Sequence, residues 1–345
     1  MSEQSPEPGS EEWLSQVQED AIDPTRPIID PHHHLWGSGR RWPSYQIEDL
    51  RADTSSGHRI EKTVFVECRE SYRAEGAVHL RPVGETEFVA RVARASRVGG
   101  GRGGGGGAMI AGIVAHADLR LSASVLREVL SAHAKAGEGL FRGIRHAGAR
   151  DANPEALTIP GRGAEGLYAN EDFRAGVALL GASGLTYDTW HYHHQNPAFA
   201  ELARATPGTT LVLDHFGTPL GVGAYAGQRE QIFARWQRDI EDIAKCPNVV
   251  AKIGGLAMPD NGYGWDLRAT PPTSDEVVEA QGRYYRHAIE CFGPERCMFE
   301  SNFPVDRRSL GYAVYWNAMK KIAAPYSECE QHAMFFGTAQ RVYRL

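Results

Sequence analysis

The sequence predicts an α/β protein in which eight parallel strands alternate with helices and close into one (β/α)8 barrel. Three observations support this fold class. Eight short segments rich in Val, Ile and Phe recur along the 345 residues, segments with helical periodicity stand between most of them, and no change in composition divides the chain. Eight strand–helix units in about 300 residues are typical of a closed barrel. An open, doubly wound sheet would need a Gly-rich nucleotide turn after the first strand, where this chain has PHHHLW.

The strands are assigned from β-branched and aromatic content between turn signals. We expect them, in chain order, at residues 28–30, 61–68, 109–118, 141–148, 185–195, 209–217, 248–255 and 297–304. The helices are assigned from apolar residues at three- and four-residue spacing; acidic residues open the first, and Pro197 stands in the first turn of the fourth. We expect them at 84–97, 122–136, 170–183, 197–206, 228–246 and 274–292, with two or three more in 309–345.

Two segments are expected to lack regular structure. The run GGGRGGGGG at 99–107 follows a helix and lacks the GK[ST] ending of a phosphate-binding loop, so we interpret it as a flexible connection. Residues 1–22 are acidic and polar, and we expect them to form a flexible N-terminal arm. Residues 23–345 then form the barrel domain.

Composition limits the partners and the compartment. The chain is 42% hydrophobic and 23% charged with a net charge of -6, so neither nucleic acid nor an anionic membrane is expected as a partner. No apolar run approaches the ~20 residues that span a bilayer, and the polar N-terminus does not resemble a signal peptide. The five cysteines are scattered without a CxxC pair, which indicates a reducing, cytoplasmic setting. We expect a small-molecule substrate and, because such barrels often pair through their outer helices, a homodimer.

The first strand runs directly into three histidines, in PIIDPHHHLW at 27–36. Residues two apart in a strand share a face, so His32 and His34 can aim at one point while His33 faces away. Two imidazoles that converge at a strand end are typical of a metal site or an acid–base site. A His-rich surface turn is the alternative.

Polar side chains crowd the ends of the other predicted strands as well. In chain order they are Glu67, Arg69, Glu70, His116, Asp118, Arg142, Arg145, His146, Asp188, His191, His193, His194, Asp214, His215, Lys252, Glu300, Asn302 and Asp306. Barrel enzymes build their sites at these strand ends, and buried polar groups without partners cost several kcal/mol. The convergence therefore predicts an active site rather than a set of unrelated structural residues.

With these motifs the chain resembles the amidohydrolase-2 (amidohydrolase-related) branch of the amidohydrolase superfamily, which includes lactonases acting on 2-pyrone-4,6-dicarboxylate and on L-fuconolactone. The motifs that carry the resemblance are DPHHH (30–34), FRGIRH (141–146), YHHQ (192–195), LVLDHFGTP (211–219), NVVAKIGG (248–255) and MFESNFPVD (298–306). The resemblance implies a TIM barrel with hydrolytic chemistry. It also implies roles for His32 and His34 as the strand-one pair, for His215 as the DHxG histidine, and for Arg142 or Arg145 as the contact to a substrate carboxylate.

The chain departs from this family pattern in two places. The last strand of the family usually ends in GSD-W/F-P, but here Asn302 stands in place of the aspartate that binds metal and moves the proton. An amide is no base and a weak metal ligand, so Glu300, two residues earlier on the same face, is the candidate for that role. In the fifth strand, His191 and His194 are added around His193.

These residues allow two kinds of chemistry. His32, His34 and His215 can hold a divalent metal, with zinc the expected ion, and Glu300 or Glu67 can take a proton from water. In a metal-free route the same histidines polarise a carbonyl and one acts as base. The predicted site contains His32, His34, His215, Glu300 and Asn302 as catalytic residues, and Arg142, Arg145, His191, His193, Glu67, Trp36 and Tyr192 as substrate-binding residues.

The sequence thus favours a hydrolase that opens a lactone or similar cyclic ester in a carboxylated small molecule, with one arginine as a bidentate clamp. The long loops 149–170 and 256–272 are candidate lids. A decarboxylase or other lyase on the same scaffold is the alternative, and a binding protein that has lost catalysis is a third reading because of Asn302.

Overall fold

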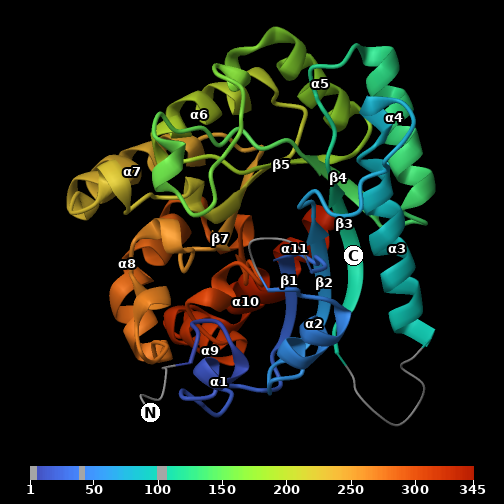
Figure 1. The fold of residues 1–345 in the computed structure, drawn as a ribbon. Coiled ribbons are helices and arrows are strands. Elements are labelled where there is room, and N and C mark those ends of the chain that lie inside the picture. The colour runs from blue at the N-terminus through green and yellow to red at the C-terminus, as the bar shows by residue number, and fades with distance from the viewer. Residues whose placement is uncertain (1–5, 39–42, 99–106) are drawn as a thin grey trace.

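The computed structural model describes residues 6–38, 43–98 and 107–345, and it confirms the single barrel (Figure 1). Eight parallel strands are hydrogen-bonded to one another in sequence order. They span Pro27–His33 (β1), Arg59–Val66 (β2), Met109–Ala115 (β3), Phe141–Arg145 (β4), Thr186–Thr189 (β5), Leu211–Leu213 (β6), Val249–Gly254 (β7) and Cys297–Glu300 (β8). The glycine run predicted as a flexible connection lies, except for Gly107, outside the described residues.

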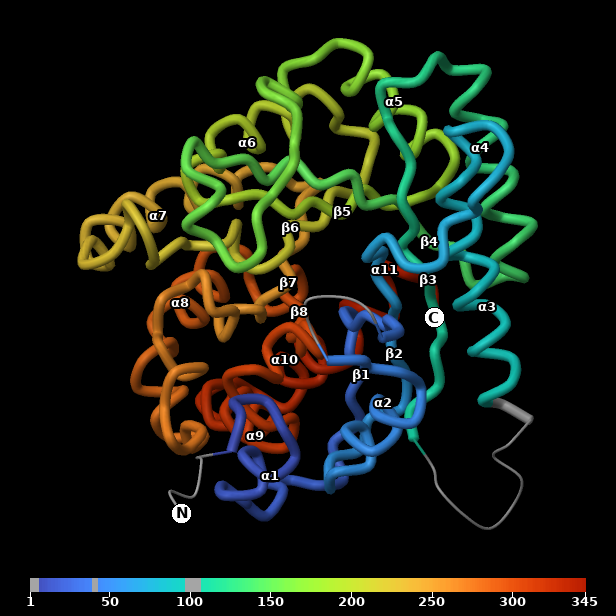
Figure 2. The backbone as a smooth tube through the Cα atoms, viewed as in Figure 1, coloured from blue at the N-terminus to red at the C-terminus, as the bar shows by residue number. Residues whose placement is uncertain are grey.

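Helices cover the outside of the strands (Figures 1 and 2). They span Glu11–Leu14 (α1), Ile47–Thr54 (α2), Val83–Val98 (α3), Ala123–Ala136 (α4), Glu171–Ala182 (α5), Asn196–Ala205 (α6), Arg229–Ala244 (α7), Ser274–Phe292 (α8), Tyr312–Ala323 (α9), Glu328–His332 (α10) and Thr338–Tyr343 (α11). The six helices expected between strands are confirmed as α3 to α8. The helices expected after the last strand are confirmed as well. Within the described part of the chain, no helix is long and apolar enough to cross a membrane.

The barrel closes where β8 meets β1. The N–H of His34 donates a hydrogen bond to the carbonyl of Phe303 at 2.8 Å, and the N–H of Asn302 donates to the carbonyl of His32 at 3.1 Å. A parallel bridge also joins His33 to Phe303. The closure therefore brings the histidines that follow the first strand next to the residues that follow the last one.

The core has two layers. The larger one lies between strands and helices and includes the fully buried Trp236 and Trp316. The smaller one fills the inside of the barrel with side chains such as Val64 and Val212, and α11 adds Tyr343 to it. Because the interior is packed rather than hollow, a site for a small molecule has to lie at the open ends of the strands.

The N-terminal segment contacts the barrel. Trp13 of α1 is fully buried and its Nε1–H donates to the carbonyl of Arg268 at 3.0 Å. Asn317 of α9 accepts from the N–H of Ile22 at 2.8 Å and donates to Glu19 at 2.9 Å. Figure 2 shows α1 beside α9. Residues 6–22 thus contact the barrel through a buried tryptophan and a few hydrogen bonds, and the flexibility expected of the N-terminal arm stays a prediction.

Several predicted strands end earlier than expected, and the fifth and sixth are those that affect the site most. The segment 185–195 leaves the sheet after Thr189, and the segment 209–217 leaves it after Leu213. In the second, Asp214–Gly217 form a 3₁₀ turn in which His215 and Phe216 have φ of +54° and +57°. Alternating strand geometry therefore stops at Leu213, and the functional residues of this segment lie in a turn.

Candidate active site

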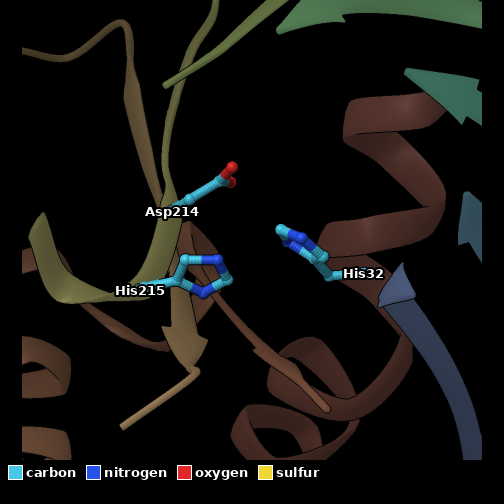
Figure 3. A group of neighbouring side chains, drawn as sticks. All are labelled: His32, Asp214 and His215. Atoms are coloured by element: carbon cyan, nitrogen blue, oxygen red, sulfur yellow. The ribbon is translucent and has the colours of Figure 1, made fainter. Parts of the chain in front are cut away.

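Three buried side chains converge at the ends of β1 and β6. His32 belongs to the end of β1, and Asp214 and His215 follow β6 directly. The ligand atoms of these residues lie within 4.8 Å of one another, and Figure 3 shows both rings and the carboxylate around a common space. We call His32, Asp214 and His215 the central group. Asp214 occupies the place in it that the sequence interpretation gave to His34.

The turn after β6 explains how two consecutive residues reach the same space. On a strand, Asp214 and His215 would point to opposite faces. The left-handed backbone of His215 breaks that alternation. Gly255, after β7, makes room for the ring, because a Cβ there would lie 2.3 Å from Nδ1 of His215. This close approach requires glycine at that position.

Glu300 orients both imidazoles. Its Oε1 accepts a hydrogen bond from Nδ1 of His215 at 2.7 Å, and its Oε2 lies 2.6 Å from Nδ1 of His32. The hydrogen bond to Glu300 places the proton of His215 on Nδ1. For His32, Nη1 of Arg145 can only donate to Nε2, so the proton of this ring is also on Nδ1, and both Nε2 atoms present a lone pair. Carboxylates that hold metal-ligating histidines do so in this way. Both oxygens of Glu300 therefore lie next to imidazole nitrogens, although Oε2 makes no hydrogen bond within the described part of the chain. Its role as the base stays a prediction.

His34 stands between the central group and the cavity. Its Nδ1–H donates to the carbonyl of Val66 at 2.8 Å, and its Nε2 lies 3.3 Å from Nε2 of His32. His33 points away, as predicted, and its ring contacts Phe65 edge-on at 5.9 Å. The strand-one pair thus shares a face, but only His32 joins the central group.

Arg145 lies between the central group and the cavity and is already paired. Its Nε–H donates to Oε1 of Glu67 at 3.0 Å. Its Nη1 lies 3.3 Å from Nε2 of His32 and 3.6 Å from Oδ2 of Asp214. Burial raises the pKa of Glu67, but the charge of Arg145, its hydrogen bond and the neighbouring His116 and Arg69 together lower that pKa below the usual value. Arg145 is therefore the predicted site arginine, yet its charge is largely compensated by protein carboxylates.

A second buried cation lies on the other side of Asp214. Nζ of Lys252 is 2.8 Å from Oδ2 of Asp188 and 3.3 Å from Oδ1 of Asp214. The hydroxyl of Tyr343, from the C-terminal helix α11, also donates to Oδ2 of Asp188. The position of Asp214 thus depends on contacts that extend through the barrel to the end of the chain.

The central group fits a divalent cation. Burial lowers the pKa of His32 well below its usual value and that of His215 to about 3, so both rings are neutral. Neither oxygen of Asp214 accepts a hydrogen bond from the described residues. Two imidazole nitrogens and a carboxylate are a donor set that zinc prefers. His32, His215 and Asp214 are the residues that would hold the ion.

Charge balance supports the same fit. The cations in and beside the central group are Arg145 and Lys252. The carboxylates are Glu67, Asp188, Asp214 and Glu300. When all of these groups are ionised, two negative charges remain uncompensated. Burial raises the pKa of Asp214 to about 6 and that of Glu300 to about 8. A divalent ion would neutralise the excess and favour the ionised carboxylates.

A cavity of about 610 Å³ opens above His34 and Arg145. It is rich in arginine, histidine and tryptophan, and the loop 149–170 forms part of its wall. Its lining residues are His34, Trp36, Glu67, Cys68, Arg69, His116, Asp118, Arg120, Arg145, His146, Ala147, Ile159, Pro160, Arg162, Gly163, Ala164, Trp190 and Val305. The second candidate lid, 256–272, contributes none of these residues. A cavity of this size suits a small polar molecule.

Arg142 and Asn302 lie elsewhere than predicted. Arg142 bonds the carbonyl of Gly139 at 2.6 Å, before β4, and so points away from the strand ends. Residues three apart in a strand point to opposite faces, so the side chain of Arg142 lies on the other face of β4 from that of Arg145. Asn302 donates to Oδ1 of Asp306 at 2.8 Å and belongs to the closure between β8 and β1. Neither residue lines the cavity.

The strand-five residues support the site without lining it. Nε2 of His191 bonds Oδ1 of Asn196 at 2.8 Å, and Nδ1 of His193 accepts from a backbone N–H at 3.3 Å. The hydroxyl of Tyr192 donates to the carbonyl of Ile159 at 3.0 Å and so anchors the loop 149–170. None of the three lines the cavity, and each makes at least one hydrogen bond within the protein. A role for them in substrate binding stays a prediction.

Sequence reasoning left several lining residues out of the predicted site. The sequence places His116 and His146 among the polar residues at strand ends but outside the predicted site, and Trp190 is not among its candidates. The usable signal was position, because each follows a strand by one or two residues. Arg162 comes from the middle of a loop, and its place in the cavity carries no local sequence signal.

The sequence was also compared with models of protein families. A model described as "Amidohydrolase" matches residues 29–345, which is most of the chain.

Two curated relatives have similar sequences. The "Uncharacterized protein y4mH" of Sinorhizobium fredii is 29% identical over 337 residues, which cover 92% of this chain and 98% of that protein. The L-fucono-1,5-lactonase of Burkholderia multivorans is 31% identical over 176 residues, which cover 50% of this chain and 56% of that enzyme.

Among solved structures, an amidohydrolase from Burkholderia multivorans with bound zinc is similar in fold. The TM-score is 0.69 at 24% sequence identity, over 92% of this chain and 99% of the other. This similarity supports the barrel described above.

Proposed function

The chain belongs to the amidohydrolase family, and on that premise we propose that it is a metal-assisted hydrolase that opens a lactone or similar cyclic ester in a carboxylated small molecule. The observation that carries the proposal is the central group with both imidazoles held by Glu300, beside a polar cavity. A relative named as a lactonase, similar over half of the chain, supports the choice of a lactone.

The residues divide the work as follows. When bound, the divalent ion, which we take to be zinc, supplies Lewis-acid chemistry that polarises an ester carbonyl and makes water more acidic. Asp214 is the carboxylate next to this position, and its pKa of about 6 leaves it ionised near neutral pH to accept a proton from the attacking water. Glu300 keeps Nδ1 of both imidazoles protonated, so their Nε2 atoms stay available as ligands.

The cavity supplies the groups for a carboxylated substrate. Arg69 and Arg162 line it, are exposed, and have no salt bridge within 4.0 Å among the described residues. They are better placed than the paired Arg145 to bind a substrate carboxylate. Trp36 and Trp190 offer apolar surface against which a ring can pack.

The test combines metal analysis with a substrate screen. Purified wild-type protein is expected to hold about one zinc per chain, to lose thermal stability with chelator, and to consume base in a pH-stat assay with lactones. His215→Ala should abolish zinc binding and turnover, while Arg142→Ala, outside the cavity, should keep both. Release of carbon dioxide from aromatic acids without lactone opening would identify a lyase instead. Full activity with chelator present would refute the metal-assisted route.

A further inference from the structure

Two histidines outside the central group stand side by side in the cavity wall. His116 follows β3 and His146 follows β4, and their ring centroids lie 5.4 Å apart, edge to face. Both line the cavity and both are partly exposed. The proposed chemistry uses neither of them.

Backbone contacts fix opposite tautomers in the two rings. Nδ1 of His116 lies 3.0 Å from the carbonyl of Arg145, which can only accept, so this Nδ1 carries the proton and Nε2 presents a lone pair. Nδ1 of His146 accepts from the N–H of Leu119 at 3.2 Å, so its Nε2 carries the proton. The wall therefore offers an acceptor and a donor next to each other.

The surroundings keep both rings in these roles. Asp118 has an oxygen 3.7 Å from Nδ1 of His146, but Arg120 already holds that carboxylate through two bonds of 2.9 and 2.8 Å. Burial lowers the pKa of His146 to about 4, so the ring is neutral at physiological pH. No hydrogen bond from the described residues reaches Nε2 of either ring. These two atoms remain for a molecule in the cavity.

We propose that His116 and His146 form a hydroxyl-binding pair, in which Nε2–H of His146 donates to, and Nε2 of His116 accepts from, hydroxyl groups of the substrate. A hydroxyl, or two adjacent ones, both accepts and donates, whereas a carboxylate cannot donate and an ammonium cannot accept. Resting on the proposed function, this narrows the substrate to a hydroxylated lactone. Arg69 and Arg162 would bind the carboxylate of this substrate, and the histidine pair would bind its hydroxyl groups.

The first experiment compares lactones that differ in hydroxylation. Wild-type protein is assayed with a panel of aldono-1,5-lactones of different configuration, with their C6-carboxylated analogues, which carry the carboxylate of the proposed substrate, and with unsubstituted δ-valerolactone. We expect a strong preference for at least one hydroxylated member. His116→Leu and His146→Leu should each lower kcat/KM for that lactone about 10- to 100-fold, while δ-valerolactone changes less than about twofold. His79→Leu, outside the cavity, is the control. Equal losses on both lactones, or a wild type without preference, would overturn the inference.

A second experiment separates this inference from the proposed function. Binding of the corresponding aldonates and of hexanoate, which has no hydroxyl, is measured by calorimetry. One outcome is that aldonates bind and both variants weaken this binding, but the protein opens no lactone. In that case the hydroxyl-binding pair is supported and the proposed reaction is refuted. If no aldonate binds and no aldonolactone is opened, the pair is refuted.

A third measurement needs no substitution and therefore tolerates a variant that fails to fold. Long-range ¹H–¹⁵N spectra of histidine-labelled wild-type protein report the tautomer of each ring, and a single-residue label assigns the signals. We expect His116 protonated at Nδ1 and His146 at Nε2. The same tautomer in both rings, or a charged ring at neutral pH, would remove the basis of the inference.

Discussion

Two of the histidine clusters at the strand ends are used differently. The first cluster consists of His32, His34 and His215. Nδ1 of each of these rings faces Glu300 or a backbone carbonyl, and Nε2 faces the space between the rings or another ring. In the strand-five cluster, Nε2 of His191 is taken by Asn196 and Nε2 of His194 lies 3.0 Å from the carbonyl of Arg150. The partner of each ring nitrogen, rather than burial or position, separates a histidine that can act from one that holds the fold.

The largest expected effect is the loss of one ring of the central group. His215→Ala removes a ligand and leaves Glu300 without one of its partners. We expect kcat/KM to fall at least about 10³-fold, because metal ions contribute several kcal/mol of transition-state stabilisation. Zinc content and turnover of the purified variant check this, with His194→Ala as the matched control from the other cluster. Comparable losses in both variants would erase the contrast between the clusters.

A smaller effect is expected when the ligands remain but their orientation is loosened. Glu300→Gln keeps the shape of the side chain and removes the charge that holds both Nδ1–H groups. Zinc affinity should fall about 10- to 100-fold, as for other carboxylates that orient metal-binding histidines. Competition with a chromophoric chelator measures it. Unchanged zinc affinity with lost activity would return Glu300 to the role of base that the sequence suggested.

The contacts beneath Asp214 should matter less. Tyr343→Phe removes the hydroxyl that bonds Asp188 and leaves Lys252 and Asp214 in contact. We expect zinc affinity to fall roughly two- to tenfold. The lost hydrogen bond is worth about 1 kcal/mol, and it reaches Asp214 only through Asp188 and Lys252. Leu345→Ala, in the same C-terminal segment, is the control for general loosening of that segment. A larger loss of affinity in the control would mean that packing, not the hydroxyl, positions Asp214.

The strand-five cluster should show the reverse pattern. His191→Leu leaves the buried Oδ1 of Asn196 without its partner. Urea unfolding should show a loss of about 1–3 kcal/mol in stability, the cost of an unsatisfied buried polar group. Zinc affinity and activity per folded molecule should stay within about twofold. A stable variant that has lost zinc would place His191 in the active site after all.

Much of the fold was accessible from the sequence because its signals are local and periodic. The eight strands, the helices α3 to α8 and the place of the site at the strand ends follow from such patterns. His32, His215, Arg145 and Glu67 were assigned to the site and lie in or beside the central group. The contacts of residues 6–22 with the barrel were not predicted, because they depend on the burial of Trp13 against residues more than 250 positions away.

The membership of the central group was harder to predict, because it depends on backbone geometry that a period-two pattern does not describe. Asp214 was recognised at its strand end but is not among the predicted site residues, and strand alternation would place it opposite His215. The left-handed turn brings the two together. Glu300 reaches Nδ1 of two rings because β8 lies beside β1 in the closed barrel. That contact joins residues 85 and 268 positions apart and leaves no mark in the sequence around them.

The central claim is that His32, His215 and Asp214 hold a divalent ion while Glu300 orients the two rings. Anomalous diffraction at the zinc absorption edge, on crystals of the wild-type protein grown with zinc, tests it most directly. The account predicts one strong peak between Nε2 of His32, Nε2 of His215 and the carboxylate of Asp214, with Glu300 still in contact with both Nδ1 atoms. An absent peak, or a peak whose ligands exclude Asp214, would contradict it.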